Sequence, residues 1–188
     1  MGDMSSANDP AAADVRLARM KLLDTKFRAN KLRYVFQCAL AGVAMLVLLA
    51  ILTTISNAAV IAALGASAFL VFAVPHARSC RARFLIGGYV AGAAAGSLCY
   101  WLRCVSPLPE RLGLIPELPG VVFGAAAVGL ATFVMVITDS EHPPAAGLAL
   151  GFALLDEWRW VTLVAVMGGI VGLCLIKILL RRVLRDLL

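Results

Sequence analysis

Six apolar segments, separated by charged residues, proline or asparagine, constrain this chain more than any other feature of its sequence. They span residues 34–55, 58–74, 84–104, 119–138, 142–155 and 160–180. A helix rises ~1.5 Å per residue and the hydrocarbon core of a bilayer is ~30 Å thick, so about 20 apolar residues cross it. Four segments reach that length, and the second and fifth are short. Because 62% of the residues are hydrophobic and only 15% charged, an ordinary soluble domain is excluded. We predict an all-α polytopic membrane protein.

Lysine and arginine are concentrated in three places. Of the 17 in the chain, seven lie in residues 1–33, three in 75–83 and four in 177–185. Cytoplasmic loops of membrane proteins are enriched in these residues. All three places share one side of the membrane only if each of the two short segments also crosses. We therefore predict six membrane segments, four long and two short or broken, in a cell (inner) membrane with both termini cytoplasmic.

Six crossings divide the chain into two halves of inverted topology with three segments each. Residues 1–33 are predicted to form a cytoplasmic tail with a basic amphipathic helix, 34–104 the first half, 105–118 an extracytoplasmic loop, and 119–188 the second half with a basic C-terminus. The short segment is the middle one in each half. In transporters built from inverted repeats, substrate binds near the midplane where discontinuous helices of the two halves meet. We therefore expect a site between the short segments.

The short segment of the first half contains Gly65, Ala66, Ser67 and Ala68 in succession. Small residues allow helices to approach closely. The Ser67 hydroxyl can also donate and accept a hydrogen bond. The cluster is therefore compatible either with helix packing alone or with contact to a ligand.

The short segment of the second half begins with a polar stretch that contains Ser140, Glu141 and His142, followed by Pro143 and Pro144. Proline suits the first turn of a helix, where its missing N–H costs nothing. We therefore expect a helix to begin at the prolines, with Ser140, Glu141 or His142 near its cap. A helix N-terminus attracts anions, and His142 could add a donor.

Asp139 and Glu141 flank this helix start and would repel an anion unless they are protonated, paired or turned away. They could instead cap the helix, bind a cation or carry a coupled proton together with His142, because ionisable residues at membrane depth usually have a function. If they lie in a cytoplasmic loop, a capped helix start is the simpler interpretation. No metal site is predicted, because this loop has no second ligand cluster to complete one.

Both motifs, in this order, resemble those of the HPP family of integral membrane proteins. The similarity rests on Gly65-Ala66-Ser67-Ala68, Phe72-Ala73-Val74-Pro75, Gly87-Gly88 and His142-Pro143-Pro144-Ala145-Ala146-Gly147, and it extends over about residues 34–180. The family is commonly described with four membrane segments, and members from cyanobacteria and chloroplasts are regarded as nitrite transporters. The resemblance implies a permease for a small anion, with Gly65, Ala66, Ser67, His142, Pro143 and Pro144 as its binding residues.

The predicted function is thus a transporter or channel for a small inorganic anion, with nitrite as the first candidate and Ser140 as a further contact. Two alternatives remain: a cation or proton channel or carrier that uses Asp139 and Glu141, and a non-transporting membrane scaffold or sensor subunit. We expect no catalytic residues and no cofactor, because no paired nucleophile and base and no nucleotide-binding loop is recognisable. The expected partners are the lipid bilayer and further copies in a homo-oligomer, with no nucleic acid.

Overall fold

The computed structural model describes residues 30–51, 57–106 and 118–187. Within these ranges the regular elements are all helical, which confirms the predicted all-α fold. The α-helices are α3 (Lys31–Ile51), α4 (Ala58–Ala73), α5 (Ala82–Val105), α7 (Leu118–Ile137), α8 (Pro143–Ala153) and α9 (Trp160–Leu180), and the 3-10 turn η2 (Arg78–Cys80) lies between α4 and α5. The long helices α3, α5, α7 and α9 are each long and apolar enough to cross a membrane. Most of the predicted basic tail lies outside the described residues.

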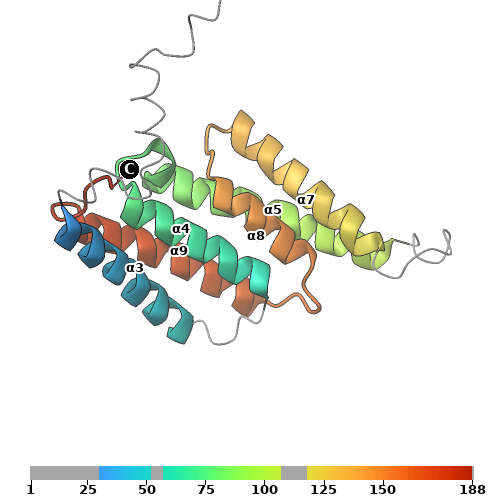
Figure 1. Cartoon of the computed structure of the whole chain (residues 1–188). Coiled ribbons are helices and arrows are strands. Elements are labelled where there is room, and N and C mark those ends of the chain that lie inside the picture. The colour runs from blue at the N-terminus through green and yellow to red at the C-terminus, as the bar shows by residue number, and fades with distance from the viewer. Residues whose placement is uncertain (1–29, 52–56, 107–117, 188) are drawn as a thin grey trace, which may run out of the picture.

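The helix boundaries differ from the predicted segments by a few residues. Helix α3 begins at Lys31, so residues 31–33 belong to the first membrane helix and not to the tail. Helix α4 has 16 residues and α8 has 11, which correspond to about 24 and 16 Å of helix. Helix α8 alone is therefore too short to cross the hydrocarbon core. Residues 154–159 continue from it to the opposite end of the bundle, where α9 begins (Figure 1).

Successive helices run in alternating directions along the bundle (Figure 1). Each helix of the second half therefore runs opposite to its counterpart in the first, and the short helices α4 and α8 are the middle members. These two helices lie against each other. Helix α4 also packs against α9, and α8 also packs against α5. Helix α5 is the most buried of the four long helices. The two halves thus meet along α4, α5 and α8.

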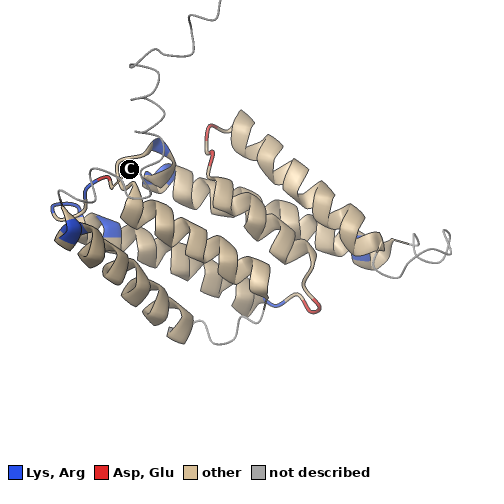
Figure 2. Cartoon of the chain, viewed as in Figure 1, with Lys and Arg blue, Asp and Glu red and all other residues tan. Residues whose placement is uncertain are grey.

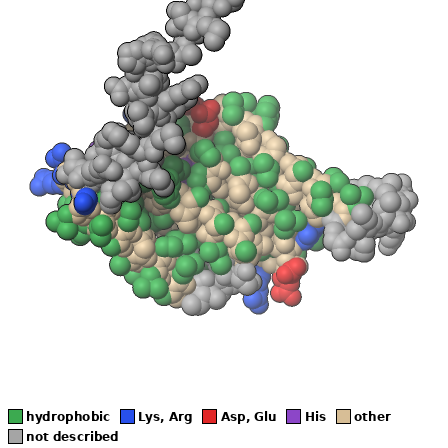
Figure 3. Space-filling view, viewed as in Figure 1, with side chains coloured by type: hydrophobic (Ala, Val, Ile, Leu, Met, Phe, Trp, Pro, Cys, Tyr) green, Lys and Arg blue, Asp and Glu red, His purple; other side chains and the backbone are tan. Residues whose placement is uncertain are grey.

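Charged residues lie at the two ends of the bundle, with none along the middle of the described helices (Figure 2). We call the end that holds the start of α3, η2, the loop between α7 and α8, and the residues after α9 the basic end. Its described cations are Lys31, Arg33, Arg78, Arg81, Arg83, Lys177, Arg181, Arg182 and Arg185. The opposite end has Arg103 and Arg159 among the described residues. Between the ends the visible surface is largely apolar (Figure 3), which matches a protein surrounded by lipid.

The chain turns between α7 and α8 through a left-handed residue. Asp139 has φ 50°, its amide donates to the carbonyl of Val136 at 3.3 Å, and the amide of Ser140 donates to that of Met135 at 2.9 Å. This six-to-one bond over a left-handed residue is a Schellman-type helix end. After it, burial alternates: Asp139 and Glu141 are exposed, whereas Ser140 and His142 are buried. The turn therefore decides which of these four polar side chains enter the protein.

Glycines allow α5 to pack directly on α8. A Cβ atom at Gly88 would lie 2.6 Å from the Cβ of His142, and one at Gly92 would lie 2.3 Å from the carbonyl oxygen of Ala145. At Gly96 it would lie 2.5 Å from the carbonyl oxygen of Ala149. Only glycine fits at such distances. The spacing of four residues repeats the small-residue pattern of close helix pairs in membranes, and it positions the start of α8 against α5.

Candidate functional site

Ser67 of α4 and His142, the residue before α8, are hydrogen-bonded inside the bundle. The Oγ of Ser67 lies 2.8 Å from the Nε2 of His142, and both residues are fully buried. The bond joins the first half of the chain to the second. A buried polar group is costly unless it is hydrogen-bonded, so the two side chains stabilise each other's position.

Tyr89 of α5 and the turn η2 complete a chain of hydrogen bonds. The Tyr89 hydroxyl lies 2.8 Å from the Oγ of Ser67, and the Nδ1 of His142 lies 3.0 Å from the carbonyl oxygen of Ser79. Because a carbonyl can only accept, Nδ1 carries the hydrogen; in a neutral ring Nε2 is then an acceptor for the Ser67 hydroxyl, whose single hydrogen is shared with the carbonyl oxygen of Ala63. Tyr89 can then donate to Ser67. We call Ser67, Tyr89 and His142 the buried polar triad.

The surroundings of the triad hold it in place. The Ser67 hydroxyl also lies 3.0 Å from the carbonyl oxygen of Ala63, one turn earlier in α4. The rings of Tyr89 and His142 lie against each other, with centroids 5.7 Å apart. On the other side, the missing side chain of Gly88 leaves the space that the Cβ of His142 occupies. Four backbone segments, α4, η2, α5 and the start of α8, therefore converge on the triad.

The other residues of the first motif do not join the triad. Gly65 is half-buried, and a Cβ there would lie 3.9 Å from the Cε of Met45 in α3. Ala66 is exposed on the surface of α4. Ala68 is buried in the hydrophobic core. Because successive residues of a helix point in different directions, only Ser67 of this motif forms hydrogen bonds within the triad.

The polar residues before α8 are separated in the same way. Ser140 is buried against Gly87, and its hydroxyl lies 2.7 Å from that of Thr138. Asp139 forms an exposed ion pair with Arg78, and Glu141 is exposed. Of the three residues singled out for proton coupling or ion gating, only His142 therefore lies in the interior.

The start of α8 offers fewer amide donors than a helix N-terminus usually does. Pro143 and Pro144 have no N–H, and the amide of Ala145 donates to the carbonyl of His142 at 2.9 Å. Pro143 is exposed and Pro144 is half-buried. The first three helical positions therefore have no free N–H for an anion in this conformation. The expectation of an anion held by free amides of this first turn is not supported, and the donors at the site are side chains.

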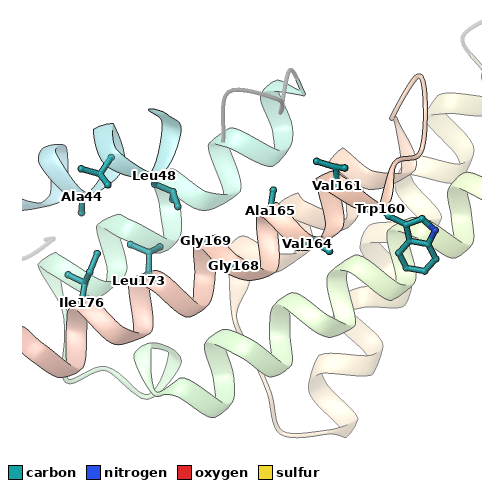
Figure 4. A pocket seen from close by; sticks show the side chains of 12 residues that line it. Ala44, Leu48, Trp160, Val161, Val164, Ala165, Gly168, Gly169, Leu173 and Ile176 are labelled. Carbon is teal, nitrogen blue, oxygen red and sulfur yellow. The ribbon is translucent and has the colours of Figure 1, made fainter. Parts of the chain in front are cut away.

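A groove with a volume of about 700 Å³ lies away from the triad, between α3 and α9. Figure 4 shows that residues from Trp160 to Ile176 line it from α9, and Ala44 and Leu48 line it from α3. Its walls are apolar except for the indole at one end. Apart from the indole N–H of Trp160, the walls offer an inorganic anion neither a side-chain donor nor a cation, so the groove is not a candidate for binding one.

Tyr89 and Ser79 were not predicted as site residues. Tyr89 follows Gly87-Gly88, a pair that belongs to the motifs singled out in the sequence, but a single tyrosine in an apolar segment is more often a core or interfacial residue. Ser79 takes part through its backbone carbonyl. Every residue has such a carbonyl, so the residue type at this position gives no indication of the contact. The adjacent glycine pair was the one available indication that α5 approaches the second motif.

Comparison with known proteins agrees with the motifs. A family model described as the HPP transmembrane region matches residues 25–186. No curated protein and no solved structure gives a match to this chain. The match covers all of the described helices, including both residues of the Ser67–His142 bond. The protein is therefore a membrane protein of the HPP family.

Proposed function

We propose that this protein transports a small inorganic anion across a membrane, with nitrite as the first candidate, past the buried polar triad. The observation that carries the proposal is the hydrogen bond between Ser67 and His142 inside a mostly apolar bundle. Ser67 and His142 belong to opposite halves, and a substrate site between inverted halves is the usual arrangement in transporters of that design. No carboxylate of the described residues lies in this cluster.

The triad has the chemistry to replace part of the hydration of such an anion. Two hydroxyl groups and one imidazole converge there, and in the present state they satisfy one another. When the helices separate slightly, an anion placed between Ser67 and His142 accepts hydrogen bonds from both hydroxyls. A proton taken up at the Nε2 of His142 gives a third donor and neutralises the charge. We therefore propose that transport of the anion is coupled to a proton.

The surroundings favour this proposal over cation conduction through Asp139 and Glu141. Both carboxylates are exposed at the basic end, and Asp139 is already paired with Arg78. That end carries an excess of cations (Figure 2), which attracts anions and repels cations. The same excess supports a cytoplasmic position of this end, and hence of both termini, in the inner membrane of a cell.

Two further expectations belong to the same proposal. The protein is a transporter and not an enzyme, and it forms a homo-oligomer. Gly168 and Gly172 of α9 support the second, because a Cβ at either position would have no neighbour within 4 Å among the described residues. Small-residue faces of this kind commonly pack against another helix in the bilayer. Crosslinking in native membranes tests the oligomer independently of transport.

Nitrite uptake into proteoliposomes tests the function, with protein-free liposomes as the baseline. We expect uptake above the baseline, which an inward proton gradient increases. Ser67→Ala and His142→Gln should each lower it by more than about tenfold, the effect of losing one hydrogen bond to a charged ligand. Thr132→Val is the matched control, because it removes a hydroxyl that is exposed on α7 and bonded to its own helix.

The outcomes separate the candidate functions. If Asp139→Asn abolishes ion flux while His142→Gln leaves it unchanged, the protein conducts cations or protons and the anion proposal is wrong. If the folded protein moves neither anions nor cations but retains one defined partner from the membrane, the scaffold or sensor alternative replaces it. Gel filtration of every variant excludes misfolding as the cause of a lost flux.

A further inference from the structure

A small pocket at the basic end gathers three cationic side chains from two segments of the chain. Its volume is about 320 Å³, and it is lined by Pro75, His76, Arg81, Lys177, Arg181 and Leu184. Arg81 immediately precedes α5, Lys177 lies in the last turn of α9, and Arg181 follows that helix. The segments are brought together by folding, because Arg81 and Lys177 are far apart in the sequence.

The positive charge of this pocket is largely uncompensated. Neither Arg81 nor Arg181 forms an ion pair within the part of the chain that the structure describes. Lys177 donates one hydrogen bond, 2.5 Å long, to the carbonyl oxygen of Cys80, which leaves two of its N–H groups free. The carboxylate of Asp186 lies 3.3 Å from the Nδ1 of His76, a lining residue, and accepts a hydrogen bond from the His76 backbone amide. Three permanent cations thus face one carboxylate.

We propose that this pocket binds an anionic phosphate group. Two guanidinium forks and an ammonium are the donors that phosphate oxygens accept best, and three cations balance a phosphate better than a monovalent halide. The chemistry fits either the headgroup of an anionic phospholipid or free phosphate.

The position of the pocket agrees with a phosphate at the membrane surface. It lies where the apolar part of α9 ends, and Ile178 and Leu179, in the last turn of that helix, are exposed apolar side chains. Acyl chains of a phospholipid can lie along these residues while the headgroup enters the pocket. Basic pockets between transmembrane helices bind anionic headgroups in this way.

The pocket also shares a structural element with the buried polar triad. Consecutive carbonyls of η2 accept hydrogen bonds from the two sites: Ser79 from His142 and Cys80 from Lys177. A phosphate that engages Lys177 therefore acts on the same turn that orients His142. The binding itself is a separate property and is measured without any flux.

Native mass spectrometry of the full-length protein in detergent tests the proposal. It is titrated with phosphatidylglycerol, with phosphatidylcholine as the zwitterionic control and inorganic phosphate as the competitor. Replacing both pocket arginines, in Arg81→Gln/Arg181→Gln, should weaken phosphatidylglycerol or phosphate binding on the order of twenty-fold, since each cation contributes about fivefold. The matched control is Arg83→Gln/Arg182→Gln, which removes two exposed cations of the same end that do not line the pocket.

Each result supports or overturns the inference. Loss of binding in the pocket variant alone supports it, and competition by inorganic phosphate then distinguishes a free-phosphate site from a headgroup site. Equal losses in both double variants mean a diffuse attraction to the basic end and overturn the pocket. Absence of binding by either probe to the unaltered protein overturns it as well. None of these outcomes changes the expectation for nitrite flux, so the two proposals fail separately.

Discussion

The Nε2 of His142 lies 2.8 Å from the Oγ of Ser67, although the two residues are 75 positions apart in the chain. Each belongs to the short middle helix, or its cap, of a different half. The bond therefore reports directly on how the two halves are placed against each other. Any movement of one half along the other must break it, and a ligand that replaces it is coupled to that movement.

Removing the hydroxyl of Tyr89 tests the order of donors in the triad. Tyr89→Phe keeps the ring against His142 and removes only the hydroxyl that is hydrogen-bonded to Ser67. We expect the free energy of unfolding in mixed micelles to fall by about 1 kcal/mol, the usual net value of one hydrogen bond, and nitrite uptake to fall with it. Unchanged stability and uptake would mean that Tyr89 serves only to pack the core.

Adding one methyl group to α5 tests how closely it approaches α8. Gly92→Ala places a Cβ 2.3 Å from the carbonyl oxygen of Ala145, so the helices must separate, at a cost of about 1–3 kcal/mol. Gly129→Ala on α7 is the control, because nothing in the described part of the chain lies within 4 Å of the added atom. It should be neutral or stabilising by about 0.5 kcal/mol. Equal thermal stability of the two variants would contradict the packing described for α5 and α8.

The helices were predictable because charged residues and prolines mark the ends of the apolar segments clearly. The predicted segments agree with the observed helices to within three residues at every end that the structure describes; the end predicted at residue 55 lies outside the described residues. The shortness of α4 and α8 is visible in the sequence. Ser67 and His142 were both identified as site residues. Their direct contact was not, because hydrophobic patterning says which segments span the membrane but not which faces of two short helices meet.

Whether the side chains of Asp139 and Glu141 point to the surface or into the bundle could not be predicted, for a related reason. Four consecutive polar residues look alike in composition, and their directions depend on the left-handed conformation at Asp139. From there the side chains alternate, as in any extended segment. This places His142 inside and Glu141 outside. The positive φ of Asp139 therefore leaves Asp139 at the surface, paired with Arg78, while His142 enters the buried polar triad.

The left-handed turn itself can be tested at Asp139. Asp139→Gly should retain or raise stability, because glycine adopts a positive φ without strain. Asp139→Val should lose about 1–2 kcal/mol, because a β-branched side chain is disfavoured there. The exposed pair with Arg78 contributes little to either value. Glu141→Val, at a neighbouring exposed position without a positive φ, is the control and should be close to neutral in chemical unfolding.

Cysteine labelling tests whether both short helices carry the chain across the membrane. In a background without the five native cysteines, single cysteines replace His76 at the basic end and Glu157 at the opposite end, both of which are exposed. The six-crossing arrangement predicts that a membrane-impermeant maleimide reaches position 157 from outside intact cells and position 76 only after lysis. A protein in which α8 returned to its own side would show position 157 inside. That result would contradict the inverted arrangement of the halves, and with it the placement of the Ser67–His142 bond between them.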